Sequence, residues 1–260
     1  MLLDRLRITG LDKQDMDHIR DSSSSDTAIP PEARAHVHRI IHTVKFHSWD
    51  TRPKPRELLI LCDAKMDNLV HLCRAITALL CEYVEKWLRG RDKCVSMIYF
   101  CRLHVEPDDA QSGVRAMMRS MICQLLEQYF KDVQFQEQDI DLDALDTGGI
   151  EVLCNMLQWL VRQVSSDTRL VCIVDGATAY EGERYKGELW KALDCLLNLV
   201  RDETVPATVK VLVACYKDTF KINKAFRLRD DKIIPLEQIC PYDTSIFDGS
   251  SGRSGCNCKR

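Results

Sequence analysis

The stretch "RLVCIVDGATAYEGE" at residues 169–183 decides the fold. It opens with an apolar run from Leu170 to Val174, which ends at Asp175 and Gly176. A continuous apolar run of this length, bounded by turn residues, is typical of a β-strand that is buried on both faces. In a parallel α/β fold, an acid at the carboxyl end of such a strand lies at the edge where ligands bind. Two interpretations of Asp175 therefore have to be compared: it holds a metal ion, or it only ends a strand.

Similar apolar runs recur along the chain, with a helical pattern between successive runs. Further strands are predicted at 57–62, 94–101 and 209–216, and a short one at 231–236, whose proline favours an edge position. Helical patterns cover 68–90, 112–130, 148–164 and 187–203. Because helices separate strands of nearly continuous apolar character, we expect a mainly parallel sheet of about five strands between two helical layers. The predicted fold class is a three-layer α/β/α fold.

The segments before and after the alternating strands and helices indicate where the domain begins and ends. A short helix is expected within residues 1–20, and the polar stretch at 21–32 reads as a linker. A helix with an apolar face begins at Pro31 and is interrupted by "SWDTRPKPRE" at 48–57. We expect an N-terminal helical extension and linker at 1–54, one α/β domain at 55–240 and a disordered tail at 241–260.

The composition of the chain indicates which partners and which cellular compartment to expect. The chain has 36 basic and 39 acidic residues, a formal net charge of −3, which gives no bulk attraction to nucleic acid or to an acidic membrane. No stretch reaches the roughly 18 apolar residues that a membrane-spanning helix needs, and the first residues lack a signal-peptide core. Ten of the 13 cysteines lie in the strand and helix patterns. We read them as reduced core thiols of a cytoplasmic protein.

The phosphate-binding loop expected after the first strand is missing. Such a loop has the pattern GxxxxGK followed by serine or threonine, so that backbone N–H groups surround the phosphates and the lysine reaches the terminal ones. The chain reads "CDAKMDNLV" at 62–70, without a glycine and without a hydroxyl residue after the lysine. Lys65 is present, but Asp63 and Asp67 flank it and would repel a triphosphate. An ordinary phosphate loop is therefore excluded.

The acid that ends the third strand stands alone. Gly176 and Ala177 follow Asp175, so no second carboxylate is adjacent to orient or activate a water molecule for hydrolysis. We interpret Asp175 as a strand-end residue that caps the next segment, with magnesium binding as the alternative.

Four pieces of the chain together resemble the STAND-class P-loop NTPase domains, and most of all the NACHT-like modules of large fungal proteins. They are "ELLILC" at 57–62, "MIYFCRLH" at 97–104 with "GVRAMMRSMICQLL" at 113–126, "LVCIVDGATAYE" at 170–181, and "VKVLVACY" at 209–216. The likeness covers roughly residues 55–240.

The resemblance implies roles for some residues and none for others. It equates 170–175 with the Walker B strand and 209–216 with the sensor strand, so that Asp175 matches the Walker B acid. Nothing matches the Walker A lysine with its glycines, and the family's acidic pair after the Walker B strand is absent. Family members with intact motifs are ATP- or GTP-dependent switches that drive assembly, often in self/non-self recognition or defence. The departures imply a relative that has lost nucleotide hydrolysis.

Other residue patterns have simpler interpretations than a site. His38 and His42 share a helix face at metal-ligand spacing, but no HExxH motif accompanies them, and we expect solvated or capping histidines. The acidic stretch at 139–146 lacks the glycine and the glutamate of a calcium loop, since Ala144 and Ile150 occupy those positions. The exposed pair at Cys256 and Cys258 is too close in sequence for a zinc site of its own.

Two further patterns concern a thiol enzyme and a partner surface. Cys62 or Cys101 ends a strand and His104 follows, but a thiol nucleophile needs a base within hydrogen-bond reach, and core packing explains the cysteines better. The methionine-rich helix at 112–130 could bind a partner helix, yet packing on its own sheet accounts for the same stripe.

The sequence thus predicts a cytoplasmic, non-catalytic, NTPase-like scaffold or regulatory interaction module of a fungal signalling or defence system. It needs no cofactor, and its partners are proteins rather than nucleic acid or membrane. The alternative is an atypical nucleoside triphosphatase in which Lys65 and Asp175 hold ATP or GTP with magnesium. In that case both side chains converge at the carboxyl ends of the strands.

Overall fold

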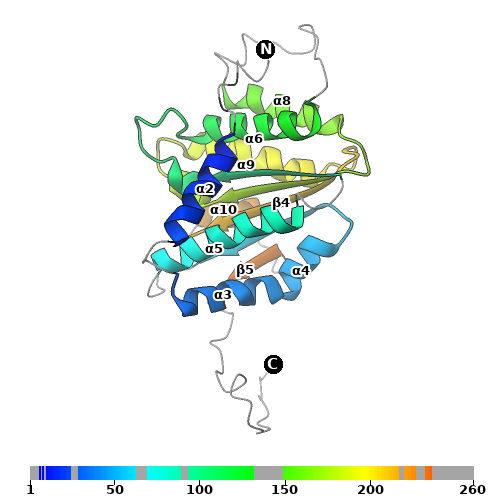
Figure 1. Ribbon diagram of the computed structural model, residues 1–260. Helices are drawn as coiled ribbons and strands as arrows, with labels where there is room; N and C mark the ends of the chain where they lie inside the picture. The colour runs from blue at the N-terminus through cyan, green and yellow to red at the C-terminus, as the bar shows by residue number, and fades with distance from the viewer. Residues whose placement is uncertain are drawn as a thin grey trace.

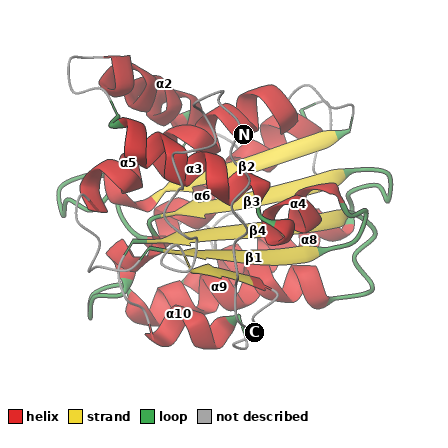
Figure 2. Ribbon diagram, turned by 90° about the horizontal axis from the view of Figure 1, so that it is seen from below, coloured by secondary structure: helices red, strands yellow, loops and turns green. Residues whose placement is uncertain are grey.

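Five parallel strands in the described part of the chain form one sheet at the centre of the molecule (Figure 1). The computed structural model describes residues 10–24, 29–62, 69–88, 93–131, 149–216, 220–226 and 232–235, together with Leu6 and Ile8. The strands are β1 (Arg56–Leu61), β2 (Cys94–Phe100), β3 (Arg169–Asp175), β4 (Thr208–Cys215) and β5 (Ile233–Pro235). They lie in the order β2-β3-β4-β1-β5, which Figure 2 shows for the first four. The predicted parallel sheet is confirmed, and the proline-containing strand lies at an edge.

Helices cover both faces of the sheet, so the predicted three-layer α/β/α fold is confirmed (Figure 1). One face carries α3 (Pro31–His42), α4 (Val44–Thr51) and α5 (Leu69–Tyr83). The other carries α6 (Val114–Tyr129), α8 (Ile150–Arg162), α9 (Lys186–Arg201) and α10 (Phe220–Ala225). Short turns follow three elements: a π-helical turn after α5 (Val84–Leu88) and 3₁₀ turns after β2 (Cys101–Leu103) and β3 (Ala177–Tyr180).

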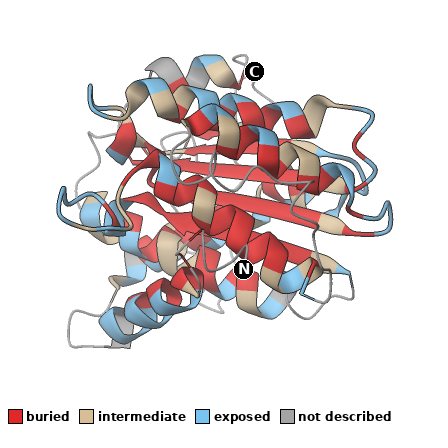
Figure 3. Ribbon diagram, turned by 90° about the horizontal axis from the view of Figure 1, so that it is seen from above, coloured by how far each residue is buried: buried red, intermediate tan, exposed pale blue. Residues whose placement is uncertain are grey.

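The strands separate two hydrophobic cores, because successive side chains point to opposite faces of a sheet. In β3, Leu170, Cys172 and Val174 belong to the core beneath α6, α8 and α9. Val171 and Ile173 belong to the core on the α3–α5 face. Both faces of the strands are buried, as Figure 3 shows, which explains why they read as continuous apolar runs.

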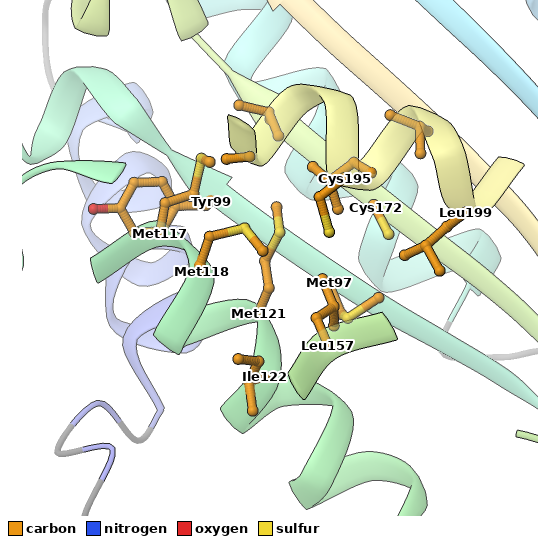
Figure 4. Close-up of a cluster of buried hydrophobic side chains, with 14 of the residues drawn as sticks. Met97, Tyr99, Met117, Met118, Met121, Ile122, Leu157, Cys172, Cys195 and Leu199 are labelled. Atoms are coloured by element: carbon orange, nitrogen blue, oxygen red, sulfur yellow. The ribbon is translucent and has the colours of Figure 1, made fainter. Parts of the chain in front are cut away.

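The methionines of α6 lie inside the first of these cores. The side chains of Met117, Met118 and Met121 have no exposed surface. They pack beside Met97 of β2 and Leu157 of α8 (Figure 4). The methionine stripe is therefore core packing, as predicted, and offers no surface to a partner.

The cysteines are buried in the same way. Each of the ten cysteines that the structure describes is a free thiol, and nine of them are buried. Burial in apolar surroundings raises the pKa of Cys172 to about 12. The prediction of core thiols is confirmed for these positions.

The helix predicted from Pro31 ends earlier and is followed by a second helix, α4, which extends into the predicted break at 48–57 and ends at Thr51. Thr43 adopts an extended conformation between α3 and α4, and its hydroxyl accepts a hydrogen bond from the Phe46 backbone N–H at 3.1 Å. Trp49 anchors α4, because its indole N–H donates to the Val211 carbonyl at 3.1 Å. An N-cap and a buried tryptophan thus form a helix that the prolines of the segment concealed.

Helix α2 (Leu11–Ser24) joins the two helical layers at the β2 side of the sheet. It extends beyond residue 20, so the first residues of the predicted linker are helical. Leu11 packs in one core, whereas Met16 and Ile19 pack in the other.

Two glutamines of α6 bind the free edge of β2. The Gln124 side-chain amide accepts a hydrogen bond from the Ile98 N–H and donates one to the Ile98 carbonyl, both at 2.8 Å. Gln128, one turn later, makes the same pair of bonds with Ser96, at 3.1 and 2.7 Å. Side-chain amides thereby replace the neighbouring strand that an edge lacks.

The Gln128→Ala variant should lower the free energy of unfolding by about 1 kcal/mol, because it removes both hydrogen bonds to the Ser96 backbone. Urea denaturation measures the change. Gln163→Ala is the matched control, since the exposed Gln163, directly after α8, donates its side-chain amide to the nearby Trp159 carbonyl and does not bind a strand edge. Equal losses in both variants would show that the edge contact contributes nothing of its own.

Candidate ligand site at the carboxyl ends of the strands

The order of the strands reverses beside β1, and a ligand would bind at the carboxyl edge of the sheet near such a reversal. The chain leaves β1 through α5 on one face and crosses to β2, then returns through β3 and β4 with α6, α8 and α9 on the other face. In open α/β sheets, ligands bind outside the carboxyl ends of the strands at such a reversal. Asp175 is the last residue of β3, and Tyr216 directly follows β4.

Asp175 is buried, and hydroxyl groups of the protein bind both of its carboxylate oxygens. Only 1% of the residue is exposed. The Thr77 hydroxyl, on α5, lies 2.6 Å from Oδ2, and the Tyr216 hydroxyl donates to Oδ1. The end of β3 therefore holds a closed hydrogen-bonded group formed by Asp175, Thr77 and Tyr216.

This environment favours the protonated form of the Asp175 carboxyl group. Burial raises the pKa of Asp175 to about 6, although the hydrogen bonds from Thr77 and Tyr216 and the charge of Arg102 act in the opposite direction. The number of hydroxyl protons available for hydrogen bonds also favours the protonated form of Asp175. The Thr77 hydroxyl also lies 2.9 Å from the Cys73 carbonyl, and it has one proton for two acceptors. A protonated Asp175 can donate to Thr77, which leaves the Thr77 proton for the Cys73 carbonyl.

The turn after Asp175 brings an arginine over the end of the strand. Gly176 has φ +72°, in the left-handed region that favours glycine. A Cβ atom at Gly176 would lie 2.6 Å from Cγ of Arg102, so the glycine also makes room for the arginine stem. The Arg102 guanidinium carbon lies 5.6 Å from the centroid of the Tyr216 ring.

A pocket of about 270 Å³ opens above this group. Its walls come from α2, α5, the turn at Cys101–Leu103 and the ends of β2 and β3. The lining residues are His18, Ile19, Ser22, Ile29, Val70, Cys73, Arg74, Thr77, Phe100, Arg102, Leu103 and Asp175. The pocket thus combines apolar walls with two arginines, and it is the place where this edge of the sheet can receive a small molecule.

Of the two predicted nucleotide-binding residues, the structure places Asp175 at the strand ends as expected. Lys65 lies outside the described residues, so its position relative to Asp175 stays a prediction. The acidic stretch at 139–146 and the pair Cys256 and Cys258 lie outside them as well. Among the residues that are described, no group of three or more histidine, cysteine or acidic side chains could hold a metal ion.

The histidines of α3 come together as their spacing predicts. Nε2 of His38 and Nε2 of His42 lie 3.1 Å apart, and the ring centroids are separated by 4.3 Å. Both rings lie on the solvent side of α3. A third ligand is missing from the described part of the chain, so the pair is consistent with the solvated histidines that the sequence favours.

A buried His104 network is the polar feature that the sequence did not reveal. Nδ1 of His104 lies 2.8 Å from Asp109 Oδ2, and Nε2 lies 3.0 Å from Asp15 Oδ2 on α2. Burial lowers the pKa of His104, but the hydrogen bonds and charges of the two carboxylates outweigh it, so the net shift is upward. The two acids hold both ring nitrogens, and Cys101 is fully buried with a strongly raised pKa, which argues against a Cys–His catalytic pair.

Fold and site together define a parallel α/β protein with a pocket at the carboxyl ends of its strands. No protein-family model matches the chain, and no curated protein does either. Within the described residues, no helix combines the length and the apolar character that crossing a membrane requires.

Proposed function

We propose that this chain is a non-catalytic, NTPase-like scaffold or regulatory interaction module. The state of Asp175 carries the proposal. Magnesium binds carboxylate oxygens at about 2.0–2.1 Å in octahedral geometry. Both Asp175 oxygens are instead bonded to Thr77 and Tyr216, and burial of the carboxyl group raises its pKa to about 6. A metal would have to displace hydroxyl groups that already satisfy the acid.

The resemblance to NACHT-like domains suggests how this arrangement relates to a nucleotide site. It equates β3 with the Walker B strand and β4 with the sensor strand. Here Tyr216, at the end of the sensor-like strand, uses its hydroxyl to bind the Walker B-like acid within the protein. A site that once faced nucleotide would thus have become an internal structural contact, and the fold would act through protein partners.

We extend the proposal to the partners and the cellular compartment of the protein. A net charge of −3 gives no reason to expect nucleic acid or an acidic membrane as partner. The free, buried thiols suit a reducing compartment, and we place the protein in the cytoplasm. By resemblance, the partners are proteins of a fungal signalling or defence system.

Thermal unfolding in the presence of nucleotides tests the proposal. ATP, GTP and ADP at millimolar concentration, with and without magnesium, should leave the melting temperature of the full chain unchanged. A ligand at ~100 times its Kd stabilises the folded state by about 2.7 kcal/mol, which would raise the melting temperature by several degrees.

The Asp175→Asn variant separates the proposal from the alternative enzyme. A magnesium-dependent shift that vanishes in this variant, but persists in Asp194→Asn, would overturn the proposal in favour of an atypical nucleoside triphosphatase. Asp194 is a suitable control because it is an exposed acid on α9. Absence of a shift in all three proteins supports the non-catalytic module.

A further inference from the structure

The pocket above Asp175 presents two arginines from different elements. Arg74 projects from α5, and Arg102 from the turn that follows β2; both are exposed. Within the described part of the chain, neither forms a salt bridge with a carboxylate. Asp175, the one carboxyl group among the described lining residues, is already bonded to Thr77 and Tyr216.

Arg102 is held where a ligand would meet it. Its stem lies against the backbone of Gly176, and its guanidinium group lies over the Tyr216 ring. Burial raises the pKa of Cys73, another lining residue, to about 12, and the charge of Arg102 acts in the opposite direction. A guanidinium group that is already positioned loses less conformational entropy when it binds an anion.

Apolar side chains form much of the remaining wall of the pocket. Ile19 of α2, Phe100 of β2 and Leu103 line it beside Val70, and the last two are 37% and 56% exposed respectively. Exposed apolar side chains around a concave surface are typical of a binding site. The volume of about 270 Å³ lies just below the usual range of roughly 300–1,000 Å³ for drug-sized ligands, so a smaller molecule fits.

We propose that this pocket binds a small organic anion, a carboxylate or phosphate monoester with an apolar part, through Arg102 and Arg74. The planar guanidinium fork matches both kinds of oxyanion, and the apolar walls take the remainder of the molecule. The inference is independent of the proposed function, because it uses neither Lys65 nor a metal ion on Asp175.

Calorimetric titration of the full chain tests the pocket with three probes that share a phenyl ring: phenyl phosphate, benzoate and the neutral benzyl alcohol. At least one anion should bind with a millimolar or tighter Kd, and benzyl alcohol at least tenfold more weakly. Tighter binding of phenyl phosphate assigns a phosphate monoester, and tighter binding of benzoate assigns a carboxylate.

Removal of one charge locates the site. Arg102→Gln should weaken binding of the preferred anion by about tenfold or more, because it removes a charge-assisted hydrogen bond. Arg184→Gln is the matched control, since Arg184 also lies over a tyrosine, with 4.9 Å from its guanidinium carbon to the Tyr185 ring centroid, but does not line the pocket. If Arg102→Gln fails to fold, the affinity of Arg74→Gln for the same anion tests the site instead.

Three results would overturn the inference. They are no binding of either anion, equal binding of benzyl alcohol, and equal affinity of the pocket variants and Arg184→Gln. A magnesium-dependent nucleotide shift would overturn the proposed function and leave this inference standing, so the two failures are distinguishable.

Discussion

Asp175→Asn should stabilise the protein at neutral pH, by up to about 3 kcal/mol more than at pH 4. The pKa of Asp175 rises from 3.8 to about 6 on folding, a difference of about two units at 1.36 kcal/mol each. Because the folded state holds the proton more tightly, the carboxyl group contributes most to stability below pH 3.8, and this contribution is lost as the pH rises through 6. Asparagine does not titrate and keeps the shape of the protonated acid.

The amide can also replace the hydrogen bonds of the protonated carboxyl group. Its oxygen can accept from Tyr216, and its nitrogen can donate to the Thr77 hydroxyl, whose proton then goes to the Cys73 carbonyl. The oxygen and the nitrogen of the amide each keep a partner, so the substitution removes a buried charge and adds one N–H group.

Urea denaturation of wild type and Asp175→Asn at pH 4, 5.5, 7 and 8 measures the effect. The difference between the two should grow from pH 4 to about pH 7 and then stay constant. The exposed Asp194→Asn should show no such growth. A difference that is constant with pH, or an Asp175→Asn variant that is less stable at pH 8, would mean that the charged carboxylate is favoured in the folded protein.

The layers and strands could be predicted because their signals are local. β3 lies at the residues expected, Arg169–Asp175, since a strand buried on both faces must be apolar along its whole length. The break and cap at Thr43 were missed, because the prolines that follow give a stronger turn signal than a single threonine.

The partners at the site could not be predicted, because they meet only in the folded chain. Thr77 and Asp175 are 98 positions apart, and His104 and Asp15 are 89 apart. The strand that ends at Asp175 was visible in the sequence, as was the missing phosphate loop. Nothing in the sequence around Tyr216 or Arg102 indicates that each would lie over the end of β3.

His104→Ala should lower the free energy of unfolding by about 3–5 kcal/mol at pH 6, because removal of one partner from a buried ion pair leaves the other charge uncompensated. Asp15, which is 7% exposed, loses its partner at Nε2, and Asp109 loses its partner at Nδ1. His47→Ala is the control, since His47 is an exposed histidine on α4. Equal effects of both variants would contradict a stabilising role for the network.

The loss in His104→Ala should shrink at alkaline pH. The folded pKa of His104 lies above its usual value of 6.5, so its contribution is fully present below pH 6.5 and is lost as the pH rises through the folded pKa. The reason is geometric: imidazolium donates to both carboxylates, whereas neutral imidazole donates to one of them. Denaturation of wild type and variant at pH 6 and pH 9 measures this change, and a loss that is independent of pH would show that neutral histidine holds the network.

The consequence of that titration should be local to α2, because Asp15 is the part of the network that belongs to this helix. Hydrogen exchange of wild-type amides in Leu11–Ser24, corrected for the intrinsic pH dependence, should show less protection at pH 9 than at pH 6, while the amides of β3 stay protected. Since α2 contributes His18, Ile19 and Ser22 to the pocket, weaker docking of this helix would also open the wall above Arg102. Equal protection of the α2 amides at both pH values would show that titration of His104 does not change the docking of α2 or the pocket wall.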